Sequence, residues 1–249
     1  MEHGSTWIAE WINSTLGPLV ASLLGGIFGL LGYSYVPGHM VIPEHITFAV
    51  LVFLFCALFF PIVGRSFSLE TPGKVQQILE LVVEFLNGQL EEIIGHGAKK
   101  YLPMVATIGI FILLMNICGQ IPGFASPTSS INVTVGCALM VFLYYNYLGI
   151  RKQGMVPYLK HFAGPVAWMA PLMIPIEIIS HLARPFSLSV RLFANIFGEH
   201  QVVAVFFTLV PFILPLPIMV LGLFTSFLQA FIFMVLTMIY IAGAVSEEH

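Results

Sequence analysis

The chain has 249 residues, of which 58% are hydrophobic and only 8% are charged, and its formal net charge is −3. Soluble domains carry about 25% charged residues, so this composition predicts a polytopic membrane protein. There is no aspartate and no basic cluster, so nucleic acid is set aside as a partner.

Long stretches without Glu, Lys or Arg predict an all-α fold with about five membrane helices. Each stretch can supply the ~20 apolar residues of a spanning helix, and none has the alternation of a membrane β-barrel. Residues 1–249 are treated as one membrane domain. Cys56, Cys118 and Cys137 stand singly in apolar runs, which indicates neither a disulfide nor a metal site, and no cofactor is expected.

The first strong span is predicted at 46–64, and its charged flanks suggest an orientation. No Lys or Arg precedes it, whereas four basic residues follow by position 100. The positive-inside rule then places the N-terminus outside and 65–100 in the cytoplasm. Residues 1–45 become an external segment. Its apolar run at 17–36 could be a span, a re-entrant piece or a surface helix, and the surface is favoured because a span would reverse the N-terminus.

An amphipathic cytoplasmic helix is predicted over 72–98, with Thr71 as N-cap and Pro72 at the first helical position. Its glutamates are interpreted as a solvated face. Residues 101–150 hold no charge and predict two spans, separated by the turn-rich IPGFASPTSS. Basic residues after 150 return the chain to the cytoplasm, which also puts the C-terminus there. Asn116 lies inside the first of these spans, where an amide needs an internal partner.

Two long helices are predicted at 166–205 and 211–245, both longer than a vertical span requires and therefore strongly tilted. A kink is expected at Pro185. The first helix carries a narrow polar stripe at helical spacing. Its members are Glu177, Ser180, Arg184, Ser187, Arg191 and Asn195.

A charge at bilayer depth costs at least ~2.5 kcal/mol, so this stripe should face a cavity or a partner and is a candidate functional site. The alternative for Arg191 is a packing arginine that reaches the interface. For Arg184 the alternative is pairing with Glu177 or lipid phosphate. For His181, lining a proton path and packing against other helices are equally expected.

Four segments in chain order carry a family resemblance. They are TPGKVQQILELVVEFLNG, LLMNICGQIPG, PIEIISHLARPFSLSVRLFANIFGEH and LQAFIFMVLTMIYIAGAVSEEH. Together they resemble subunit a of the F-type ATP synthase over roughly residues 45–249. The resemblance implies a stator subunit with two offset proton half-channels, which is not catalytic on its own but couples proton translocation to rotation and ATP synthesis. It also implies a bacterial inner membrane location.

The resemblance implies roles for particular residues and partners. The essential arginine of the family, which faces the rotor carboxylate, falls on Arg191, with Asn195 and Gln229 as its neighbours. The remaining matches are proton-path positions: Glu177, Ser180, Ser187, Asn116, Glu199 and His200. The implied partners are a ring of c subunits, the b subunits of the peripheral stalk, the other ATP synthase subunits and the lipid bilayer.

The chain departs from the family pattern at Glu199, where relatives usually have a small residue. Gly222 falls where some relatives carry a histidine or glutamate. We therefore hypothesise that Glu199 replaces the missing acid or base beside His200. The alternative is an exposed glutamate at a helix bend.

Two other classes of membrane protein would show features that this sequence lacks. A secondary transporter would show a repeat between its halves, and none is visible here. An intramembrane hydrolase would need a nucleophile or metal motif such as G-x-S-x-G or H-E-x-x-H, and neither occurs. Copurification with a hairpin-sized rotor protein would distinguish the ATP synthase subunit from a transporter and from a hydrolase.

Overall fold

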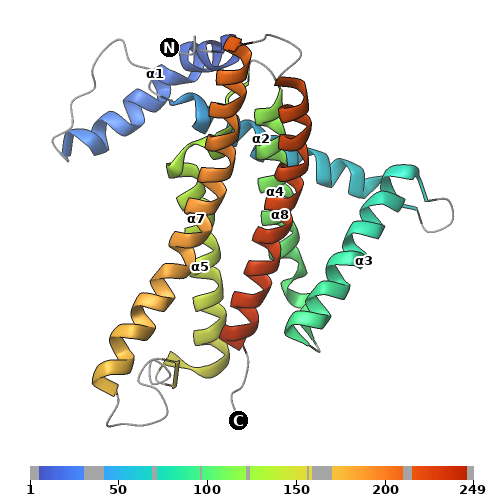
Figure 1. Ribbon diagram of the computed structural model, residues 1–249, viewed down its shortest axis with the longest axis vertical. Coiled ribbons are helices and arrows are strands. Elements are labelled where there is room, and N and C mark those ends of the chain that lie inside the picture. The colour runs from blue at the N-terminus through green and yellow to red at the C-terminus, as the bar shows by residue number, and fades with distance from the viewer. Residues whose placement is uncertain are drawn as a thin grey trace.

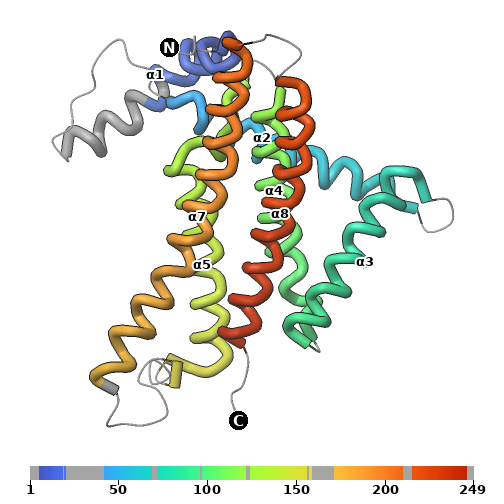
Figure 2. The backbone as a smooth tube through the Cα atoms, viewed as in Figure 1, coloured from blue at the N-terminus to red at the C-terminus, as the bar shows by residue number. Residues whose placement is uncertain are grey.

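The computed structural model describes residues 6–30, 42–68, 72–95, 97–121, 124–155, 157–158, 170–209 and 215–245, whose path is coloured in Figure 2. This part of the chain contains helices and no strand. Five of the helices are long and apolar enough to span a membrane. The predicted all-α polytopic fold is therefore confirmed.

The helices follow one another as α1 (Trp7–Leu30), α2 (Glu44–Arg65), α3 (Lys74–Ile94), α4 (Leu102–Gln120), α5 (Ile131–Gln153), α7 (Ala170–Leu209) and α8 (Pro215–Val245). Short 3-10 turns, η1 (Ala98–Tyr101) and η2 (Pro127–Ser129), precede α4 and α5. The five spans are α2, α4 with η1, α5, α7 and α8. Their limits lie within a few residues of those expected, except that α5 runs on through Gln153 and α7 through Leu209.

Helices α4, α5, α7 and α8 run alongside one another, and α2 lies across them (Figure 1). Helix α7 ends and α8 begins at the upper end of the view, whereas α5 ends and α7 begins at the lower end. At ~1.5 Å per residue, the 40 residues of α7 extend ~60 Å, twice the ~30 Å thickness of hydrocarbon. Its length therefore supports the expected strong tilt.

One apolar core joins α3, α4, α5, α7 and α8. Its largest fully buried side chains include Tyr145, Phe233, Leu90, Ile112, Met115, Leu188, Leu192 and Ile241. Gly109 allows α4 and α8 to approach closely, because a Cβ there would overlap the side chain of Met234. Many large apolar side chains on α2 stay exposed, for example Phe53 at 60%. Such a surface suits lipid.

Two details at the helix ends differ from the expectations. Helix α3 begins at Lys74, two residues later than expected from Pro72, with Gly73 at its N-cap; Thr71 lies outside the described residues. Helix α7 is continuous through Pro175 and Pro185, and the kink at Pro185 stays a prediction. Helix α1 begins at Trp7, ten residues before the apolar run at 17–36. It packs against α2, and Asn13 Nδ2 donates to the Ile42 carbonyl, just before α2, at 2.8 Å. The placement of α1 on the outer surface stays a prediction.

Candidate functional site

The predicted polar stripe lies on one continuous helix, α7. Ser180, Ser187, Arg191 and Asn195 are exposed, and Glu177 and Arg184 are half-buried. On the adjoining face Leu188, Leu192 and Ile196 are at most 1% exposed and pack into the bundle. Leucine and isoleucine at every fourth position therefore fix α7 and leave the stripe open beside the packed face.

Neither arginine of the stripe has a carboxylate partner within the described chain. Among these residues an ion pair joins Lys99 to Glu91 at 3.7 Å, and both side chains are exposed. The Arg184 guanidinium instead lies over the ring of Tyr240, 5.7 Å from its centroid, which is a cation–π arrangement. The alternative of an Arg184–Glu177 ion pair is not realised. Arg191 is an uncompensated positive charge on an apolar helix.

Helix α8 completes the site by pairing with α7 in antiparallel fashion. Asn195 Nδ2 donates to Gln229 Oε1 at 2.7 Å, so two of the predicted residues meet one turn beyond Arg191. Gln229 is 2% exposed, and its Nε2 is buried with no hydrogen-bond partner among the described residues. A buried donor left in this way is costly.

Two turns beyond Arg191 along α7, Glu199 reaches α8 at Gly222. A Cβ at Gly222 would overlap the Glu199 carboxylate, so that carboxylate occupies the space of a position-222 side chain. Gln120 Nε2 on α4 donates to Glu199 Oε1 at 2.6 Å, and Thr225 Oγ1 lies 3.4 Å from Oε2. Glu199 lies within a continuous helix, half-buried and hydrogen-bonded, which contradicts the alternative of an exposed residue at a bend. His200 is also half-buried.

Asn116 is fully buried and connects α4 to the same face of α8. Its Oδ1 accepts from Thr128 Oγ1 at 2.8 Å, and its Nδ2 lies 3.5 Å from the Ser226 carbonyl oxygen. The Ser226 hydroxyl is buried and has no partner in the described part of the chain. Gly222, Ser226 and Gln229 follow at spacings of 4 and 3 and share one helical face. A polar row therefore leads from Glu199 toward Arg191.

Sequence reasoning missed three of these residues, Gln120, Thr225 and Ser226. Gln120 was the detectable one, since a glutamine at the end of an apolar span needs a partner. Glu177, Ser180 and Ser187 were identified, but the structure does not connect them to the Asn195–Gln229 pair by hydrogen bonds between described residues. They form a separate group toward the lower end of α7.

Known proteins that are similar to this chain identify its family. The family model described as the ATP synthase A chain matches residues 45–242. ATP synthase subunit a of Solibacter usitatus is 49% identical over 204 residues, which cover 82% of this chain and 88% of that protein. The Koribacter versatilis subunit a is 40% identical over 246 residues, covering 98% of both chains. The subunit a of Geobacter sulfurreducens is 45% identical over 194 residues, covering 78% and 84%. The chain therefore belongs to the ATP synthase A chain family, as a multi-pass membrane subunit of the proton-translocating sector.

Proposed function

We propose that this subunit forms the stator face of a rotary proton channel, in which Arg191 faces a carboxylate carried by each subunit of a rotor ring. The observation that carries this proposal is an exposed arginine without a carboxylate partner in the described chain, set beside the Asn195–Gln229 pair. Membership of the family supplies the other ATP synthase subunits as partners. The ring and the peripheral-stalk b subunits are the partners proposed for this face.

The charge of Arg191 explains how a proton leaves the rotor. A carboxylate must be neutral to cross lipid, because burying an unpaired ion there is prohibitive. As the rotor carboxyl approaches the guanidinium, the fixed opposite charge stabilises its ionised form and lowers its pKa by ~1–3 units. The same positive charge repels protons from the seam between two offset paths. Rotation then connects the paths, and each proton crossing 100 mV contributes ~2.3 kcal/mol.

The two paths are assigned to the two polar groups on either side of Arg191. Glu177, Ser180 and Ser187 form the cytoplasmic path, because that end of α7 follows the Arg151–Lys160 loop and its basic residues. The outer path uses Asn116, Glu199 and His200. Its support is the polar row along α8 and the position of the Glu199 carboxylate in the space beside Gly222. The membrane is the bacterial inner membrane, with the N-terminus outside and the C-terminus inside.

The central test is ATP-driven proton pumping by inverted membranes that contain Arg191→Ala. We expect pumping to be abolished while the subunit still assembles, and Arg151→Ala at the exposed end of α5 is the matched control that keeps pumping. Pumping at the wild-type rate in Arg191→Ala would overturn the assignment.

The role of Glu199 is tested by moving its carboxylate across the helix pair. Glu199→Gly should slow pumping severalfold, and adding Gly222→Glu should restore most of the rate, because the new side chain enters the space that Glu199 vacated. Glycine is needed at 199, since a glutamine there would still fill that space. A double variant no faster than the single one would show that the carboxylate does not act from this position.

A further inference from the structure

A hydrogen-bonded junction between α5 and α7 lies far from Arg191, around His181. Its centre is Asn146 on α5, whose Nδ2 donates to the Phe142 carbonyl at 2.6 Å. That bond orients the amide and leaves Oδ1 as an acceptor for two donors. His181 Nε2 and the hydroxyl of Tyr158 both lie 2.8 Å from this oxygen.

This arrangement determines the tautomer of the imidazole. Because Asn146 Oδ1 can only accept, the hydrogen of neutral His181 is on Nε2. The nitrogen that takes up a further proton is then Nδ1. Protonation and deprotonation at Nδ1 leave the Nε2–H bond to Asn146 in place. The ring can therefore change charge without losing the contact that holds it.

The second donor to Asn146 is itself fixed. Gly154, with φ 87°, ends α5 and turns the chain back, so that the Tyr158 ring lies over Gly149, where a Cβ would collide with it. Tyr158 is 8% exposed. Burial raises the pKa of its hydroxyl more than nearby Arg184 lowers it, so Tyr158 stays protonated and donates at neutral pH. The amide oxygen of Asn146 thus remains an acceptor over the physiological range.

The charged and titratable groups facing His181 come from every neighbouring element that the structure describes. Glu177 and Arg184 stand four residues before and three after it on α7, the spacings at which helical side chains are neighbours. From α5 the Tyr145 hydroxyl lies 3.5 Å from Nε2. The turn contributes Tyr158, and α8 contributes Tyr240, whose ring lies under the Arg184 guanidinium.

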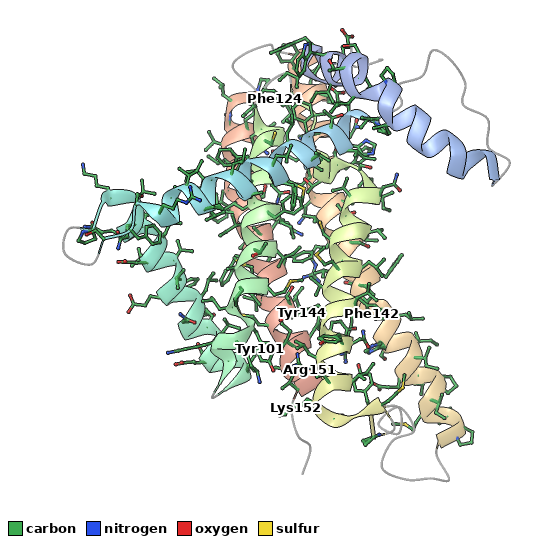
Figure 3. The ribbon with its side chains drawn as sticks, turned by 180° about the vertical axis from the view of Figure 1, so that it is seen from behind. Tyr101, Phe124, Phe142, Tyr144, Arg151 and Lys152 are labelled. Atoms are coloured by element: carbon green, nitrogen blue, oxygen red, sulfur yellow. The ribbon has the colours of Figure 1, made fainter. Side chains whose placement is uncertain are left out.

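The junction lies where α7 leaves the bundle. None of residues 171–180 is buried, whereas Leu188 and Leu192 beyond them are core residues. Figure 3 shows Phe142 on α5 at the level where α7 diverges, and its ring meets the His181 ring edge-on at 5.3 Å. The imidazole therefore stands between the open segment that carries Glu177 and the packed segment that carries Arg191.

We propose that His181 exchanges protons at Nδ1 on the cytoplasmic path, between Glu177 and the part of the stripe nearer Arg191, while Asn146 holds the ring at Nε2. This inference rests on the function proposed above and adds a residue to it. The proton enters Nδ1 from the Glu177 carboxyl or from water, the ring becomes imidazolium, and the same nitrogen releases the proton onward. No covalent bond to carbon changes.

The test compares His181→Gln with Tyr158→Phe in the assembled complex. Glutamine keeps an N–H for Asn146 but does not titrate, whereas phenylalanine removes one donor and leaves the imidazole. Pumping by inverted membranes, whose cytoplasmic side faces the medium, is measured from pH 5.5 to 8.5. We expect His181→Gln to pump roughly three- to tenfold more slowly than wild type, with a flatter profile through the range where imidazole titrates. Tyr158→Phe should keep the wild-type profile.

Chemical rescue separates proton exchange from packing. Imidazole added to the medium should restore part of the pumping lost in His181→Ala and should leave Arg191→Ala inactive. A wild-type pH profile in His181→Gln, or no rescue of His181→Ala, would make His181 a packing residue and overturn this inference. The proposed function fails separately, on full pumping by Arg191→Ala.

Discussion

At the scale of single residues, the space at Gly222 supports the proposal that a carboxylate on α7 replaces an acid or base on α8. A carboxylate from α7 fills the position that a side chain on α8 would take, and an amide from α4 holds it there. The sequence could suggest the exchange, because the family resemblance implies that Glu199 and Gly222 depart from the usual pattern. It could not show that the two positions meet, since that depends on the pairing of α7 with α8. Gln120 was detectable as a polar residue at the end of an apolar span, but its bond to Glu199 depends on the same packing.

A methyl group at Gly222 should therefore displace Glu199. We expect Gly222→Ala to slow proton pumping severalfold, because its Cβ overlaps the carboxylate. Gly243→Ala, on the same helix and with no described atom within 4 Å of a new Cβ, is the control and should pump normally. The measurement is ATP-driven pumping normalised to the amount of assembled complex. Equal rates for the two variants would show that the carboxylate can move without consequence.

The guanidinium group of Arg191 should not be replaceable by an ammonium. Arg191→Lys keeps the charge but presents a compact, strongly hydrated group in place of a planar fork. We expect coupled pumping to stay below about a tenth of the wild-type rate, since an ammonium lacks the planar fork of donors that the guanidinium presents one turn from the Asn195–Gln229 pair. Full coupled activity with lysine would show that charge alone is sufficient.

At the scale of helices, periodicity and charge located the spans, whereas their ends depend on contacts that are distant in sequence. Helix α8 has no basic residue in its last turn, and its final carbonyls are bonded by side chains from the end of α5. Lys152 Nζ donates to the Val245 carbonyl at 2.8 Å and Gln153 Nε2 to that of Ala244 at 3.3 Å. A cation at this end also complements the helix dipole. No local pattern predicts a cap supplied 93 residues away.

Removing that cap should destabilise the lower end of the bundle. We expect Lys152→Met to lower the free energy of unfolding by about 0.5–1.5 kcal/mol, because the lysine bonds one helix-terminal carbonyl and is exposed to solvent. Thermal unfolding of the detergent-solubilised subunit can be followed with a thiol-reactive dye that reports exposure of the buried Cys137. Arg151→Met, one residue earlier and exposed, is the control. An equal loss of stability in both variants would show that the bond from Lys152 to the end of α8 is not the cause.

At the scale of the whole molecule, the stripe is exposed although it lies on a helix that is packed along its neighbouring face. The polar residues and their spacing were predictable from sequence, and so was the length of α7. The crossing of α2 over the other spans (Figure 1) was not, because helix crossing depends on which side chains interdigitate. The result is an α7–α8 surface with one open row of polar groups, suited to a partner that moves along it.

Cross-linking within the ATP synthase complex can test which face of α7 meets the rotor. Ser187 is exposed on the stripe, whereas Ser189, two residues away, is 3% exposed and bonds to the Phe186 carbonyl at 2.9 Å. After Cys56, Cys118 and Cys137 are replaced by alanine, cysteine is placed at either serine and opposite it on a rotor subunit. We expect oxidation to link Ser187→Cys to the rotor and to leave Ser189→Cys unlinked, because the latter points into the bundle. Links from Ser189→Cys alone would mean that α7 presents the opposite face, and the assignment of Arg191 to the rotor would then fail with it.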